Sequence, residues 1–344
     1  MNAPQGRQNR PSPVTCKSFL NVLWIFFFCV LSSCDRPKSK SEQVILYTAV
    51  DEPVARPVIA EFERQTGISV TIRTDAESTK TAGLAERLEA EKQNPQADVW
   101  WSNEPFHTIN LAQQKVLAAY GSPAAEKIPG EYKDKNNLWA GTSLRVRVLA
   151  VSAKCPISPR SIYDLANPAL KGKICISRPV AGTAKGHMAA LYTTLGREKF
   201  EKYLNDLKDN QVRLVGGNSI VAELVGSGQM LAGLTDNDDV DSAAREGGKL
   251  DAVLPDQGDN EMGALAIPCT AALVAGAPHD TNAKKLIDYL LSQTVEYQLV
   301  DRRFARYSVI NPSGNVKFMK VDYAQAAANM KDAVELALTI LEGR

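Results

Sequence analysis

The chain has 344 residues and a formal net charge of +1, with 40 lysine and arginine residues against 39 acidic ones. A balance this close to neutral gives no support for nucleic acid as a partner. A chain longer than about 300 residues exceeds what one compact core usually organises, so we expect two domains or lobes.

The N-terminal segment has the pattern of a secretion signal. Basic residues precede an almost wholly apolar run at 19–31, which is too short to span a bilayer as a stable anchor. The small residues before Cys34 resemble a bacterial lipobox, where a signal peptide is removed and the cysteine is lipidated. We therefore predict a signal peptide over residues 1–33 and a periplasmic protein attached to a membrane through lipid on Cys34. An uncleaved signal-anchor and a soluble-export signal are the alternatives.

After the leader, a polar segment gives way to alternating strands and helices. Residues 34–43 are polar and charged, which predicts a flexible tether. Strands are predicted at 44–49, 68–72, 97–101, 144–151, 173–176, 213–215, 231–235, 264–267 and 271–275. Helices are predicted at 53–66, 81–92, 105–114, 183–195, 197–209, 219–226 and 323–341. This alternation is typical of α/β units with helices on both faces of a sheet, and we expect two such units.

Cysteine usage is sparse beyond the leader. Only Cys155, Cys175 and Cys269 follow Cys34, so at most one disulfide can form among them, with Cys155 and Cys175 the nearer pair. Buried unpaired thiols are the alternative. Neither Cys-x-x-Cys nor His-x-x-x-His spacing occurs, which argues against a structural zinc site.

Several segments carry a resemblance to a known family. They are TAVD at 48–51, TGISV at 66–70, PQADVWW at 95–101, SLRVRV at 143–148, GGNS at 216–219 and GLTDN at 233–237. Together they resemble the iron(III)-type periplasmic binding proteins, a group within the extracellular solute-binding proteins of ABC importers.

The resemblance implies a type II periplasmic binding protein fold. Each of two α/β lobes has a mixed sheet flanked by helices, and crossing strands join the lobes around a ligand cleft. On that pattern residues 44–142 and 262–310 form lobe 1, and residues 143–261 and 311–344 form lobe 2. An inner-membrane ABC permease is the implied partner, with the binding protein itself a monomer.

The resemblance also places candidate metal ligands. Asp51 matches a ligand position after the first strand, and Asn103 or Glu104 matches the carboxylate that follows the third strand. Iron-binding members of the family carry two adjacent tyrosines after the strand at 231–235, where this chain has Asp238 and Asp239. Carboxylates are hard oxygen donors that suit ferric iron. The candidate metal ligands are therefore Asp51, Glu104, Asp238 and Asp239.

Acidic residues gather near the ends of predicted strands, the edge of an α/β sheet where ligands usually bind. Three of these acids lie within four positions, Asp236, Asp238 and Asp239, and their charges would repel one another unless a cation lay between them. The same holds for Asp51 and Glu104 if they join the cluster. This favours a cation or amine site. Capping of the following helix is the alternative for any single aspartate.

Glycine-rich turns before two helices suit an anion. Thr183 follows one such turn, and Asn218 and Ser219 follow another, where backbone N–H groups can bind oxyanions. In the resembled family these regions hold a synergistic anion, which implicates Thr183, Asn218 and Arg145. As bare glycine turns they would be common.

An acidic site that faces an anion site fits more than one solute. Ferric iron with a bound anion and an aminophosphonate zwitterion are two. A polyamine or thiamine-like cation against an aromatic face of Trp100 and Trp101 is a third. Adjacent strand residues point to opposite faces, so we expect at most one tryptophan in the cleft.

The rival class is a magnesium-dependent hydrolase using Asp238 and Asp239, which needs a nucleophile and a proton-transfer group. The sequence offers no Gly-x-Ser-x-Gly elbow and no plausible Cys/His pair. We therefore predict the non-catalytic, solute-capturing lipoprotein of an ABC importer, with no catalytic cofactor. Ferric iron with an anion is the solute by resemblance, and a ligand-relay sensor is the other non-enzyme role.

Overall fold

The computed structural model describes residues 42–74, 81–312 and 314–343. The predicted signal peptide, nearly all of the tether and Cys34 lie outside the described residues. The described residues belong to one compact unit. Among the described residues, no helix combines the length and apolarity that a membrane span requires.

The first sheet is built around parallel strands from the beginning of the chain. β1 (Gln43–Thr48) lies between β2 (Ser69–Thr74) and β3 (Val99–Ser102), parallel to both. β10 (Ala266–Val274) then runs antiparallel to β3, to β4 (Leu117–Ala118) and to the first half of β5 (Ala140–Ser152). The sheet is therefore mixed, as the resemblance implies.

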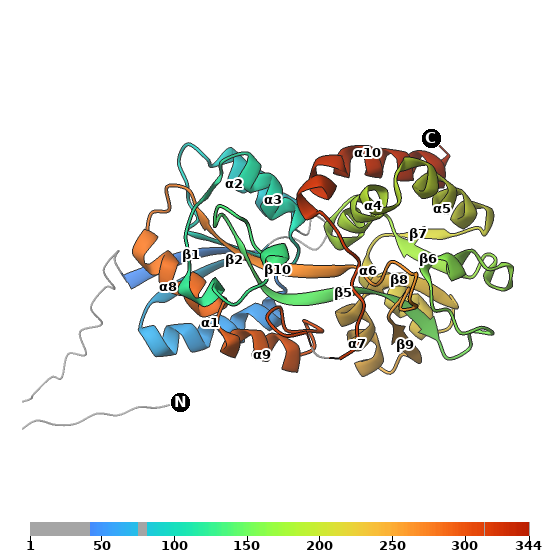
Figure 1. Ribbon diagram of the computed structural model, residues 1–344. Coiled ribbons are helices and arrows are strands. Elements are labelled where there is room, and N and C mark those ends of the chain that lie inside the picture. The colour runs from blue at the N-terminus through green and yellow to red at the C-terminus, as the bar shows by residue number, and fades with distance from the viewer. Residues whose placement is uncertain (1–41, 75–80, 313, 344) are drawn as a thin grey trace, which may run out of the picture. The chain divides into compact units, whose positions relative to one another are not determined.

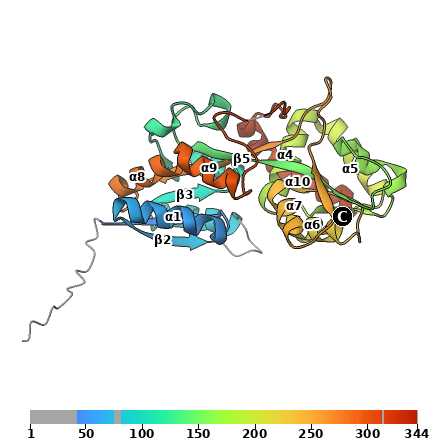
Figure 2. The ribbon, with the colours of Figure 1, turned by 90° about the horizontal axis from the view of Figure 1, so that it is seen from below.

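Helices cover both faces of this sheet (Figure 1). They are α1 (Glu52–Thr66), α2 (Ala82–Ala90), α3 (Phe106–Gln113), α8 (Asp280–Leu290) and α9 (Gln293–Asp301). Figure 2 shows α1, α8 and α9 gathered on one side. In α1 the residues Val58, Ile59 and Phe62 recur at helical spacing and are buried, and Gly67 ends the helix in a left-handed conformation.

The second sheet uses the other half of β5. There β5 runs antiparallel to β8 (Ala232–Asp236) and β9 (Leu250–Val253), while β6 (Ile174–Ser177) is parallel to β8 and to β7 (Arg213–Val215). Its helices are α4 (Gly182–Leu195), α5 (Arg197–Asp209), α6 (Asn218–Gly226), α7 (Asn237–Arg245) and α10 (Tyr323–Glu342). α10 packs small side chains, Ala326, Ala333 and Ala337 among them, against α4 and α5.

β5 joins the two sheets. Residues 140–146 pair with β10, whereas residues 147–152 pair with β8 and β9, and all of its residues are buried. The strand therefore passes from the first sheet to the second between Val146 and Arg147. The chain crosses again near Leu265, whose carbonyl accepts the Arg147 N–H.

Three expectations about the elements need correction. The strands predicted at 264–267 and 271–275 are one strand, β10, because Pro268 and Cys269 between them stay paired with Leu144 and Ser143. Helices α8 and α9 and the short strands β4 and β9 were not predicted. Cys155, Cys175 and Cys269 are all free, so the alternative of unpaired thiols is correct for the described cysteines.

Candidate functional site

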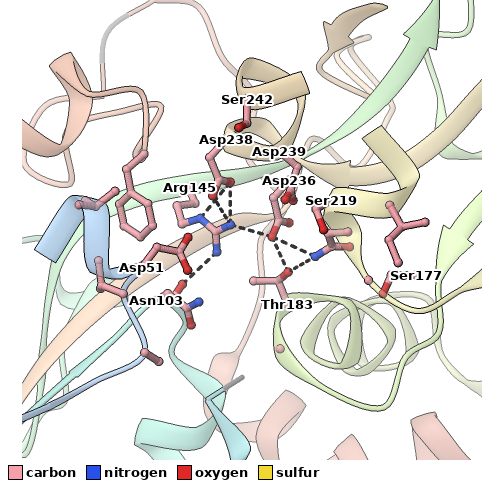
Figure 3. A pocket seen from close by; sticks show the side chains of 18 of the residues that line it. Asp51, Asn103, Arg145, Ser177, Thr183, Ser219, Asp236, Asp238, Asp239 and Ser242 are labelled. Atoms are coloured by element: carbon pink, nitrogen blue, oxygen red, sulfur yellow. Dashed lines mark hydrogen bonds and ion pairs between the residues drawn. The ribbon is translucent and has the colours of Figure 1, made fainter. Parts of the chain in front are cut away.

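A cavity of about 940 Å³ opens where helices of both sheets begin. Its walls include the N-terminal ends of α1, α4, α6 and α7 and the middle of β5. The parallel strands β1, β6 and β8 all point their carboxyl ends toward it, which is why their following helices start there. Nine residues predicted as site residues line it: Asp51, Asn103, Arg145, Thr183, Asn218, Ser219, Asp236, Asp238 and Asp239 (Figure 3).

Glu104 is the predicted metal ligand that does not line the cavity. Its carboxylate is fully buried and accepts hydrogen bonds from the backbone N–H groups of Phe106 (2.6 Å) and His107 (3.1 Å). The His107 ring nitrogen Nδ1 lies 2.9 Å from the same carboxylate. Glu104 thus satisfies the first N–H groups of α3 and does not line the cavity.

The tryptophans do not line the cavity either, which is within the expectation of at most one but leaves the polyamine or thiamine-like alternative without its aromatic face. Trp100 and Trp101 are fully buried, and the Trp100 indole N–H donates to the Thr108 hydroxyl at 2.8 Å. The aromatic residue that does line the cavity is Phe304, whose ring centroid is 5.3 Å from the guanidinium carbon of Arg145. The polyamine or thiamine-like hypothesis therefore loses its proposed tryptophan face.

Arg145 lies at the centre of the site (Figure 3). Its Nη2 donates to Asp236 Oδ2 at 3.0 Å and to the two oxygens of Asp238 at 2.6 and 2.7 Å. Its Nε donates to Asp238 Oδ1 at 3.2 Å. Asp51 and Asn103 lie on the opposite side of the guanidinium from these aspartates. Burial would lower the pKa of Arg145, but the charges of Asp238 and Asp236 raise it well above its ordinary value.

Arg147 is a further charged residue of the site that the sequence reasoning missed. Its Nη1 donates to Asp236 Oδ1 at 2.7 Å and to Asn218 Oδ1 at 3.0 Å, and its Nη2 donates to the Leu234 carbonyl at 3.1 Å. A signal was present, because arginines two residues apart in an apolar strand lie on one face. That face meets Asp236, which is the strand partner of Arg147.

Asp236 is consequently an internal structural charge. Besides the two arginines, it accepts hydrogen bonds from the Thr183 hydroxyl (2.5 Å) and from Asn218 Nδ2 (3.2 Å), both at Oδ2. Burial alone would raise the pKa of Asp236, but Arg145, Arg147 and Thr183 outweigh it and the pKa is lowered. Asp236 thus ties β5, α4 and α6 together at the base of the cavity.

Asp238 and Asp239 lie in the first turn of α7, beside Asp236. Burial, with the negative charge of Asp236, raises the pKa of Asp238 in spite of Arg145. One oxygen from each of the three aspartates can be chosen so that all lie within 4.8 Å of one another, as a metal site requires. Among the described residues that line the cavity there is no tyrosine, histidine or cysteine.

The wall next to these aspartates presents two helix N-termini. α4 begins after Ala181 and α6 begins after Gly217, and neither helix has a side-chain hydrogen bond at its N-cap. Thr183, Ser219 and Ser177 add hydroxyl groups to this wall. Backbone N–H groups and the positive end of a helix dipole attract oxyanions, so this wall suits an anionic group.

Comparisons with known proteins agree with this geometry. The sequence model of the family described as "Bacterial extracellular solute-binding protein" matches residues 44–297. The chain is 30% identical over 239 residues to a Salmonella paratyphi A protein named "Putative 2-aminoethylphosphonate-binding periplasmic protein", covering 68% of each chain. It is 24% identical to the Fe(3+)-binding periplasmic protein of Serratia marcescens, over 87% of this chain and 90% of that one.

Solved structures show the same fold. The ferric binding protein from Campylobacter jejuni superposes with a TM-score of 0.75 at 21% identity, covering 86% of this chain and 99% of that one. A Bordetella ferric binding protein superposes with a TM-score of 0.70 at 26% identity, covering 87% and 98%. The two-lobed periplasmic binding protein fold expected from the sequence is thereby confirmed.

Proposed function

Since this chain belongs to the bacterial extracellular solute-binding proteins, we propose that it captures a small zwitterion in its cleft. The solute class is an amine joined by a short linker to a phosphonate or phosphate group. A membrane ABC permease is its partner. The observation that carries the proposal is that an acidic wall and a wall of helix N-termini lie side by side in one cavity.

The acidic wall suits the amine. This wall consists of Asp236, Asp238 and Asp239, and Asp51 lies on the other side of Arg145. Together they bring four carboxylates, whereas Arg145 and Arg147 bring two guanidinium groups. The excess negative charge favours an ammonium, which can donate several hydrogen bonds to carboxylate oxygens. The cavity is also lined by three exposed glutamates and three exposed arginines, which solvent screens, and by Arg178, which is partly buried and pairs with Glu342.

The helix wall suits the phosphonate. Its oxygens would accept from the first N–H groups of α4 and α6 and from the hydroxyls of Ser219 and Ser177. Glycines 182, 216 and 217 also line the cavity, so ligand atoms can approach the backbone there closely. This support is independent of the relatives, of which several are named for 2-aminoethylphosphonate.

Ferric iron with an anion is the second candidate. The carboxylate oxygens of Asp236, Asp238 and Asp239 favour it, as do the iron-binding relatives. Two observations weigh against it: Arg145 already pairs with two of the three aspartates, and no phenolate lines the described part of the cavity. We therefore rank it below the zwitterion.

A thermal-shift series separates the candidates. We expect 2-aminoethylphosphonate to raise the melting temperature more than ethylphosphonate or ethanolamine, each of which carries one of its two charges. O-phosphoethanolamine and β-alanine replace the phosphonate by phosphate and by carboxylate, and ferric citrate tests the metal. A response to ferric citrate alone would contradict the proposal.

Variants locate the response in the cleft. Asp239→Asn removes a carboxylate from the acidic wall and should lower the affinity for 2-aminoethylphosphonate at least tenfold. The matched control is Asp251→Asn, which removes an exposed aspartate on β9. Equal affinity in both variants would show that the acidic wall does not hold the ligand.

The remaining expectations belong to the same proposal. Lipid on Cys34 would hold a monomer close to its permease, and the lobes 44–142 with 262–310 and 143–261 with 311–344 would close on the solute about β5. Cys34→Ala should release the protein from membranes in cell fractionation. A variant that stays in the membrane fraction would argue for a signal-anchor instead.

A further inference from the structure

We propose that Arg145 determines the choice between a metal ion and an organic ammonium in this cleft, because its guanidinium occupies the place among the aspartates that a metal ion would need. The inference deepens the proposed function and rests on it. It assigns to this arginine a role in specificity that is separate from holding the ligand.

The positions of the donors support this role. The guanidinium lies 2.6 to 3.0 Å from oxygens of both Asp238 and Asp236 through a single nitrogen, Nη2. These are two of the three aspartates whose oxygens lie within 4.8 Å of one another. A metal ion coordinated by the same oxygens would face a fixed positive charge at close range, and the repulsion grows with the charge of the ion.

Asp236 has little capacity left for a metal. Its Oδ1 accepts from Arg147, and its Oδ2 accepts from Arg145, Thr183 and Asn218. A carboxylate oxygen has about two lone-pair positions, so three donors saturate Oδ2 and the single donor on Oδ1 leaves about one position there. A metal would have to displace hydrogen bonds that also join β5, α4 and α6.

Arg145 is also held in place. Its side chain is only 6% exposed, it lies over the Phe304 ring at 5.3 Å, and its Nη1 lies 3.5 Å from the Asn103 carbonyl oxygen. Its backbone belongs to β5 at the point where that strand passes between the two sheets. The guanidinium therefore cannot move aside without loss of several contacts at once.

A singly charged ammonium makes weaker demands on these carboxylates than a metal ion does. It donates single hydrogen bonds to carboxylate oxygens and does not require a set of several coordinating oxygens such as those of Asp236 and Asp238, which Arg145 and Arg147 already bind. Its repulsion from Arg145 is also a third of that felt by a trivalent ion at the same distance. Arg145 thus filters cations by charge and by their demand for direct coordination.

The test is a calorimetric titration with Tb³⁺, a hard trivalent cation, in chelator-free buffer. We expect no saturable binding by the native protein and saturable binding at one site per chain by Arg145→Gln. Arg145→Lys keeps the charge and should behave as the native protein does. The control Arg197→Gln removes an exposed arginine of α5 that pairs with Glu201, and it should gain no site.

Two further measurements make the outcome decisive. Circular dichroism shows whether Arg145→Gln is folded, and the added change Asp238→Asn should abolish the site that it gains. Saturable Tb³⁺ binding by the native protein, or none by folded Arg145→Gln, would overturn the inference. The native protein alone shows whether Tb³⁺ binds saturably in the presence of Arg145, so the inference can be contradicted even if the variant folds poorly.

Failure of the inference can be told from failure of the proposed function. The thermal shift with 2-aminoethylphosphonate on the native protein tests the function and needs no metal. One outcome is that the native protein binds neither the phosphonate nor Tb³⁺, whereas Arg145→Gln gains Tb³⁺ binding. That outcome would support the role of Arg145 and contradict the zwitterion as the solute.

Discussion

Asp236 forms ion pairs with both buried arginines of the cleft, Arg145 and Arg147. Asp236→Ala would leave Arg147 and Arg145, both buried, without their shared partner. Removal of one member of a buried ion pair typically costs about 3–5 kcal/mol. We expect a loss of that size in the free energy of unfolding, measured by urea denaturation.

The control for this prediction is Asp251→Ala at an exposed position of β9, which should change stability by no more than about 0.5 kcal/mol. A loss below about 1 kcal/mol for Asp236→Ala would show that the two arginines find other partners or water.

His187 provides a pH-dependent prediction. It is buried on α4, 3.4 Å from Arg147 Nε, and Asp236 is its other charged neighbour. Burial and the charge of Arg147 lower its pKa well below the ordinary 6.5. Below pH 6.5 the unfolded chain therefore takes up a proton that the folded protein does not, and stability falls by up to about 1.4 kcal/mol per pH unit.

The measurement is the free energy of unfolding from pH 7.5 to 5 for the native protein and His187→Gln. The variant should lose part of the pH dependence, since the other two histidines contribute equally to both proteins. Identical slopes between pH 6.5 and 5 would contradict a buried neutral His187.

At the residue scale the sequence predicted which side chains gather but not how they pair. Nine of ten candidate site residues line the cavity, because the ends of parallel strands meet at one edge. Glu104 shows the limit: an acid after a strand serves equally well as a helix cap, and only local backbone geometry decides. Arg147 was missed because an arginine within an apolar strand was not matched to the acid that pairs with it across the sheet.

Among the elements, β8 is packed so closely that it tolerates no side chain at Gly233. A Cβ there would lie 2.5 Å from Val221 of α6 and 2.7 Å from the Cys175 carbonyl of β6. Gly233→Ala should therefore cost about 1–3 kcal/mol through overpacking. Chemical denaturation measures this cost.

The comparison for Gly233 is Gly130→Ala, where a Cβ would meet nothing within 4 Å. This control should leave stability unchanged or raise it by up to about 1 kcal/mol. Equal effects of the two substitutions would mean that β8 can shift away from α6 and β6.

The elements themselves were predicted where their periodicity was strong. α4, α5, α6 and α10 differ from expectation by at most one residue at either end, because a glycine at one end and apolar spacing mark each of them. β10 was split in two because Pro268 interrupts its apolar pattern, yet a register shift at Cys269 and Thr270 lets pairing continue.

At the scale of the whole molecule, ligand binding should be linked to the stability of both sheets, since both contribute to the cavity and share β5. A ligand at 100 times its dissociation constant stabilises the folded state by about 2.7 kcal/mol. We expect 2-aminoethylphosphonate to move the complete unfolding transition in scanning calorimetry. Movement of only one part of the transition would show that the ligand binds one lobe alone.

The overall architecture was predictable because segments spread over the whole chain resemble one family, and the fold follows from that family. The solute was not predictable from the sequence, because it depends on which carboxylates remain available after Arg145 and Arg147 have formed their ion pairs. That balance is a property of side-chain geometry in the folded cleft.

Capture of a zwitterion is tested most directly by a calorimetric titration of the native protein with 2-aminoethylphosphonate in buffer that contains a chelator. We expect saturable binding at one site per chain with no metal present. Absence of binding, together with tight binding of ferric iron in chelator-free buffer, would contradict it.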